Sequence, residues 1–131
     1  MTMTNASCTW LPQFAETAKD SDRFKGRNDH VLLLAAGLMG EAGSVLAELK
    51  KEQREREAYP AYRRRMHEEL GDFLWYYVRL CDLAAPGLVN ELPFSTDRVS
   101  SGAAQLPLFL QFAGSVGEIM SAVEHGAESN A

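Results

Sequence analysis

Hydrophobic residues recur at helical spacing in four segments of the chain, and no segment alternates as a half-buried strand does. The spacing predicts helices over about residues 10–19, 30–57, 60–84 and 106–126. The apolar stripe of 30–57 consists of Val31, Leu34, Leu38, Ala42, Val45 and Leu49. The stripe of 60–84 consists of Met66, Leu70, Phe73, Leu74, Tyr77, Val78 and Cys81. We therefore expect an all-α, four-helix protein.

Polar stretches and prolines separate these helices. Residues 19–29, KDSDRFKGRND, carry turn formers and predict a loop, and Asp29 can cap the helix that follows. Pro60 ends the charged tail of the second helix. Residues 85–102 contain two prolines and a Ser-Ser-Gly run, which predicts a connector with room for one helical turn. The short link at Pro60 favours antiparallel packing of the second and third helices.

Composition narrows the class of protein. The 131 residues suffice for one domain, and the net charge of −5 provides no basic field for a nucleic-acid duplex or an anionic membrane. The N-terminus lacks the features of a signal peptide, and the apolar run at 31–39 is about half the length of a membrane span. Cys8 and Cys81 make neither a disulfide framework nor a zinc cluster. We expect a cytoplasmic protein.

Acidic residues lie beside the apolar stripes rather than opposite them. On a helical wheel, Glu41, Ser44, Glu48 and Lys51 share one flank of the second helix. On the third helix Glu69 and Asp72, three residues apart, flank the stripe, and Tyr76 and Arg79 continue that line. Antiparallel packing would let both acidic flanks border one cleft.

Two interpretations of these carboxylates remain open. Facing carboxylates repel one another, and a hard divalent cation such as Mg²⁺ relieves that repulsion while binding substrate phosphates. Lys50, Lys51 and Arg79 are candidates to offset phosphate charge. Alternatively, the acids are solvated and paired with Lys or Arg along their own helices. His30, His67, Trp75 and Tyr76 are most simply packing or surface residues.

Two blocks of sequence carry a family resemblance. GLMGEAGSVLAELKK at 37–51, followed by HEELGDFLWYYVRLCDL at 67–83, resembles the MazG-like all-α nucleoside triphosphate pyrophosphohydrolases. That family carries an ExxE motif on one helix and an ExxD motif on the next. EELGD stands intact at 68–72, and the similarity covers roughly residues 10–92. The resemblance implies a dimeric helical bundle.

The resemblance also implies an activity. It is cleavage of a nucleoside triphosphate, dNTP or NTP, between the α and β phosphates, which gives a monophosphate and pyrophosphate and depends on Mg²⁺ or Mn²⁺. Glu41, Glu69 and Asp72 would then be the catalytic metal ligands. The fourth position is Ser44, where the family has Glu, so the site is either weakened or inactive; Glu48, one turn further on, is a candidate substitute. The alternative function is an inactive nucleotide-binding or dimerisation module.

The last predicted helix contains a second, degenerate copy of the first acidic motif. Setting GEAGSV at 40–45 against GSVGEI at 114–119 aligns Glu41 with Ser115 and Ser44 with Glu118. Each copy therefore keeps the Glu that the other lacks. We expect residues 1–100 to form the MazG-like unit and residues 101–131 to be the start of an incomplete repeat. Chance similarity between two glycine-containing amphipathic helices is the alternative.

Overall fold

The computed structural model describes residues 10–91 and 105–129, and every regular element in them is helical. The four α-helices are α1 (Trp10–Ser21), α2 (His30–Glu55), α3 (Tyr62–Ala84) and α4 (Gln105–Ser129). Two short 3-10 helices, η1 (Arg56–Ala58) and η2 (Leu88–Glu91), follow α2 and α3. The predicted all-α, four-helix class is confirmed for these residues. Cys8 and the middle of the connector, residues 92–104, lie outside them.

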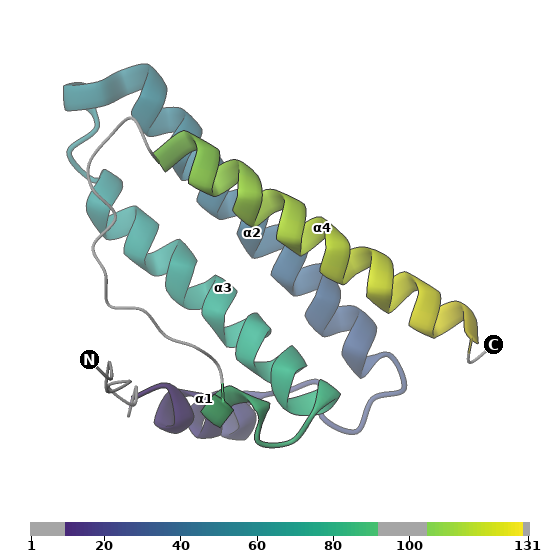
Figure 1. Ribbon diagram of the computed structural model, residues 1–131. Helices are drawn as coiled ribbons and strands as arrows, with labels where there is room; N and C mark the ends of the chain where they lie inside the picture. Colours follow the sequence, from purple (N-terminus) through teal and green to yellow (C-terminus); the bar gives the residue numbers. More distant parts are fainter. Residues whose placement is uncertain (1–9, 92–104, 130–131) are drawn as a thin grey trace, which may run out of the picture.

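The long helices form a side-by-side bundle (Figure 1). α2 and α3 run antiparallel, as the short link between them favours, and α4 lies along α2 and antiparallel to it. α1 lies across the end of the bundle where α3 finishes and α2 begins. The α1–α2 loop therefore reaches the α2–α3 seam from that end. Gly26, at φ 83°, provides a left-handed turn in this loop.

The hydrophobic core has two parts. The first joins α1, α3 and η2 through the buried side chains of Leu11, Ala18, Val78 and Val89. The second joins α2, α3 and α4 through Val45, Leu49 and Met66, with three phenylalanines packed against them: Phe73, Phe109 and Phe112. The rings of Phe73 and Phe112 meet edge to face at 4.8 Å. Thus α4 shares the second part of the core with α2 and α3.

Two residues expected on the buried stripes are exposed. Val31, in the first turn of α2, is 45% exposed, and Leu70 on α3 is 41% exposed. Periodicity predicts the direction in which a side chain points, but burial also needs a neighbouring element over it. Leu70 instead borders an apolar groove with Val45 and three residues of α4: Leu108, Phe109 and Phe112. These two expectations were wrong.

The bounds of the last helix also differ from the expectation. α4 begins at Gln105 and continues to Ser129, three residues past the Gly126 end that the sequence indicated. Pro107 is tolerated because it lies in the first turn, where backbone N–H groups have no intrahelical acceptor. Gly126 lowers helix propensity without ending the helix.

The segment His30–Ala58 is long and apolar enough to span a membrane by length and composition alone. In the structure its stripe packs within the bundle, and Leu34, Leu38 and Val45 are fully buried. A core helix of a soluble protein passes the same test, so the segment does not indicate a membrane protein. Cytoplasmic location stays a prediction.

Candidate functional site

Three carboxylates meet across the α2–α3 seam. Glu41 on α2 and Glu69 and Asp72 on α3 each offer one oxygen, and these atoms all lie within 4.8 Å of one another. Glu69 and Asp72 share a helix face because they are three residues apart, and the antiparallel neighbour brings Glu41 opposite them. Glu41 and Glu69 are half-buried, and Asp72 is exposed. The structure thus assembles the three acids that the sequence singled out.

The electrostatics of this acidic cluster favour an added positive charge. Burial raises the pKa of the Glu41 carboxyl, and the nearby charges of Asp72 and then Glu69 raise it further. A cluster of carboxylate oxygens open to solvent on one side offers the hard oxygen ligands that Mg²⁺ and similar cations take. The donor set therefore fits a divalent metal chemically.

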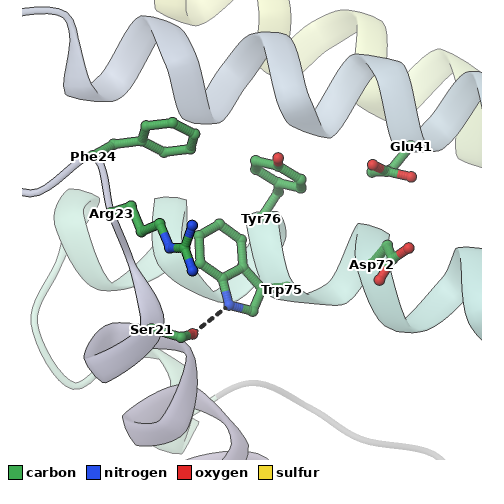
Figure 2. Close-up of a pocket in the computed structure, with 7 residues that line it drawn as sticks. All are labelled: Ser21, Arg23, Phe24, Glu41, Asp72, Trp75 and Tyr76. Atoms are coloured by element: carbon green, nitrogen blue, oxygen red, sulfur yellow. Dashed lines mark hydrogen bonds between the residues drawn. The ribbon is translucent and has the colours of Figure 1, made fainter.

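A pocket of about 300 Å³ extends from the cluster toward the α1–α2 loop (Figure 2). Glu41 and Asp72 lie at one end of it, and Arg23 and Phe24 lie at the other. Between and below them are three further lining residues: Ser21, Trp75 and Tyr76. The pocket therefore joins an acidic end to an end built from aromatic rings and a guanidinium group.

Trp75 and Tyr76, the two residues of α3 with aromatic rings in the pocket lining, are held there by their own contacts. The Trp75 indole N–H donates a hydrogen bond to Ser21 Oγ at 2.9 Å, and the Trp75 and Tyr76 rings meet edge to face at 4.9 Å. Burial raises the pKa of the Tyr76 phenol, and the charges of Glu41, Asp72 and Asp22 add to the effect. Both side chains are half-buried. Trp75 and Tyr76 were expected to be packing or surface residues. They do pack, but they also line the pocket.

Asp22 anchors the loop that supplies Arg23 and Phe24. Its fully buried carboxylate accepts hydrogen bonds from the Phe24 backbone N–H at 2.8 Å and from Arg79 Nε at 2.9 Å, and it contacts His30 Nε2 at 2.7 Å. Burial acts to raise the pKa of Asp22, but the hydrogen bonds from His30, Phe24 and Arg79 outweigh it and lower the pKa. The loop is thus tied both to α3 and to the start of α2.

Arg79 does not lie at the pocket. Its side chain is 3% exposed and also pairs with Asp82 at 3.1 Å. It is seven residues from Asp72, about 10 Å along the helix axis, and it is absent from the pocket lining. The structure therefore gives Arg79 a role in holding the loop and does not bring it to the acidic cluster, where a phosphate contact was expected.

Three other charged candidates also lie away from the cluster. Glu48, seven residues from Glu41, accepts a hydrogen bond from the Tyr59 hydroxyl, and Lys51 Nζ lies 4.2 Å from the centre of the Tyr59 ring. Lys50 is exposed on α2. Glu48 is not part of the acidic cluster formed by described residues. It therefore does not replace the family's fourth carboxylate in this arrangement.

Ser44 and Glu118, the residues that distinguish the two motif copies, add no carboxylate to the cluster. The Ser44 hydroxyl donates to the backbone carbonyl of Gly40 at 3.3 Å, one turn earlier on its own helix. Glu118 is exposed on α4. Within the described residues, the acidic cluster therefore holds three carboxylates, without a contribution from α4.

Residues from the end of α1 and from the α1–α2 loop line the pocket but were not among the predicted site residues. Ser21, Arg23 and Phe24 lie in the polar stretch 19–29 that predicted only a loop, and Asp22 belongs to the same stretch. Their role depends on a fold in which α1 crosses the end of the α2–α3 pair. The Asp-Arg-Phe order alone does not predict such a role.

Comparison with known proteins adds the family. The sequence model of one protein family, the MazG nucleotide pyrophosphohydrolase domain, matches residues 29–104, which is more than half of the chain. This range includes all three carboxylates of the acidic cluster, together with Trp75 and Tyr76. No curated protein and no solved structure matches the chain. The chain belongs to the MazG family.

Proposed function

We propose that this protein hydrolyses nucleoside triphosphates between the α and β phosphates and releases a monophosphate and pyrophosphate. The observation that carries the proposal is the cluster of Glu41, Glu69 and Asp72, two of which, Glu41 and Asp72, line one end of a pocket whose other end is aromatic. Acidic oxygens suit the metal that accompanies phosphates, and aromatic rings suit a nucleobase. Membership of the MazG family supports the same reaction.

The metal proposed for this reaction is Mg²⁺ or Mn²⁺, held by the three carboxylates. MazG proteins generally depend on a divalent metal, and the donor set described above fits one. A bound metal would offset phosphate charge and make an attacking water more acidic. The raised pKa of Glu41 supports the proposal, because burial and the negative charges of Asp72 and Glu69 disfavour the Glu41 carboxylate, and a bound cation would offset both effects.

The chain's own residues supply binding and orientation. The rings of Phe24, Trp75 and Tyr76 offer surfaces on which a base can stack, and the bond from Trp75 to Ser21 fixes one of those rings in advance. A pocket of about 300 Å³ lies at the lower end of the range for small-molecule sites. Fixed rings at one end and carboxylates at the other would align the phosphate chain with the acids.

The test is release of pyrophosphate from a panel of NTPs and dNTPs with Mg²⁺ or Mn²⁺. Asp72→Asn removes one ligand charge and is expected to lower kcat/KM at least about a hundredfold. Glu68→Gln is the matched control, because Glu68 lies on the same helix but pairs with Arg64 and Arg65 at the surface. Equal pyrophosphate release by the parent and Asp72→Asn would contradict the proposal.

A second candidate is an inactive module that binds nucleotide without hydrolysing it. Ser44 favours it, because its neutral hydroxyl stands where the family has a carboxylate and is bonded to Gly40. Calorimetric binding of a nucleoside triphosphate, with no pyrophosphate released over the whole panel, would support this alternative over the enzyme.

We also keep two proposals about organisation. Residues 101–131 would be the start of a second, incomplete repeat that carries a degenerate motif copy at 114–119, consistent with Ala42 and Val116 being buried at aligned positions. The protein would form a homodimer, and exposed apolar side chains such as Leu110, at 65%, and Met39, at 44%, offer surface for it. Light scattering of the purified chain would report its oligomeric state, and a monomeric mass would contradict the dimer.

A further inference from the structure

Among the described residues that line the pocket, one has a cationic side chain, and it lies at the end away from the carboxylates. Arg23 lines the pocket beside Phe24 and Trp75, and its guanidinium extends toward Trp75 (Figure 2). It is exposed, and it forms no hydrogen bond or ion pair with other residues in the described ranges 10–91 and 105–129. Its five N–H donors therefore remain available to a ligand.

The other polar groups near Arg23 cannot select a ligand as sharply. Ser21 Oγ already accepts from Trp75 and donates to the Ala18 carbonyl. The Trp75 N–H is used in that same bond. The Tyr76 hydroxyl both donates and accepts, so it suits either kind of partner. Arg23 differs from them because it only donates.

The backbone that carries Arg23 is fixed on both sides. Asp22, immediately before it, is bonded to Arg79 and contacts His30, and the Phe24 N–H, immediately after it, donates to Asp22. A side chain on an anchored backbone presents its donors in a limited region and loses less conformational entropy on binding. Arg23 is therefore placed to recognise the position of hydrogen-bond acceptors on a ligand, in addition to attracting negative charge.

We propose that Arg23 determines base specificity by selecting nucleobases with a carbonyl at purine C6 or pyrimidine C4, such as guanine, hypoxanthine or uracil, over adenine and cytosine, which carry an amino group there. The proposal rests on the function proposed above. Guanine offers two adjacent acceptors that match the forked donors of arginine, and uracil offers a carbonyl oxygen. Adenine and cytosine turn an amino donor toward the same region, and a donor facing donors forms no hydrogen bond.

The experiment is calorimetric titration, with Mg²⁺ present, of the non-hydrolysable α,β-imido analogues of GTP, ITP, UTP, ATP and CTP. The parent is expected to bind the GTP, ITP and UTP analogues about tenfold more tightly than the ATP and CTP analogues. Arg23→Gln keeps a polar side chain of similar length but adds an acceptor, and it should reduce that ratio to within about twofold. Lys25→Gln is the control, because Lys25 is exposed in the same loop and does not line the pocket.

The outcomes separate this inference from the function on which it rests. A uniform loss of affinity across all five analogues in Arg23→Gln would mean a contact to phosphate and would overturn base selection. Hydrolysis of the natural triphosphates with an unchanged base ratio in Arg23→Gln would overturn the inference and leave the enzyme function intact. Failure of every analogue to bind the parent, with no pyrophosphate release, would overturn both.

Discussion

The ring of Tyr76 on α3 lies directly over Gly37 on α2, so that a Cβ added at residue 37 would overlap the phenol ring. Glycine at this position allows the two helices to bring a large aromatic side chain against the backbone of α2. Glu41 lies four residues after Gly37 on α2, and Asp72 lies four residues before Tyr76 on α3. The close approach therefore lies one turn from the acidic cluster and shapes the wall of the same pocket.

Gly37→Ala should move Tyr76 and disturb the pocket. A rigid ring cannot yield as the end of a flexible side chain can, and such overpacking costs about 1–3 kcal/mol of unfolding free energy. Urea denaturation measures that loss, and nucleotide titration measures the weaker binding expected with it. Gly43→Ala is the matched control on the same helix, because nothing lies within 4 Å of a Cβ built there. Equal stability of both variants would contradict the prediction.

Asp22→Asn should destabilise the fold at neutral pH. It removes the carboxylate charge opposite the buried Arg79, and breaking a buried pair from one side costs about 3 kcal/mol. Asp29→Asn is the control: Asp29 also pairs with an arginine, Arg27, but both side chains are largely exposed, and little change is expected.

The same variant gives a defined pH dependence. The folded-state pKa of Asp22 lies below its ordinary value of 3.8, so its stabilisation is fully present above pH 3.8 and is lost as pH falls through the lower, folded-state pKa. The difference in unfolding free energy between the parent and Asp22→Asn should therefore be constant near neutrality and shrink below about pH 3.8. A difference that grows in acid would contradict this assignment.

Trp75 should report nucleotide binding by fluorescence. The chain has two tryptophans, and Trp75 lines the pocket while Trp10 lies at the start of α1. A stacked base commonly quenches indole emission, so we expect a saturable change on adding GTP analogue to a Trp10→Phe protein. Trp75→Phe, which keeps Trp10, should show no such change. A signal that persists in Trp75→Phe would place the ligand elsewhere.

Ser44→Glu should strengthen metal binding. It restores a fourth carboxylate one turn from Glu41 and removes the bond from Ser44 to Gly40. A further oxygen ligand should lower the Mg²⁺ concentration needed for half-maximal activity by roughly tenfold, and the added negative charge should destabilise the metal-free protein. Ser44→Ala removes the same hydroxyl without adding charge and should leave the metal requirement unchanged. Identical metal titrations for the two variants would contradict the prediction.

Much of the fold follows from local pattern. Helix existence and most helix bounds came from apolar spacing, and helical geometry placed Glu69 and Asp72 on one face of their helix. The family resemblance then singled out these two acids and Glu41, which the structure brings together. The antiparallel arrangement needed only a short link. The existence of a helix and the face on which a residue lies depend on residues close together in sequence, and local geometry determines them.

The exceptions share one cause. Val31 and Leu70 satisfy the periodic pattern but are exposed, while Asp22 and Arg79 are charged but buried. In each case the outcome depends on which distant segment packs over the side chain, and periodicity contains no information about that. Lys50, Lys51 and Arg79 were near the acids in sequence, whereas the cation at the pocket is Arg23, 18 residues before Glu41.

The amino-acid sequence by itself therefore determined the helical class, because apolar spacing identifies helices, and it singled out the three carboxylates through the motifs of the family it resembles. The tertiary structure decided what the carboxylates face. It brought the α1–α2 loop to the seam of α2 and α3, tied it there through Asp22, and fitted Tyr76 over Gly37. Those contacts join segments far apart in the chain, and only long-range packing fixes them.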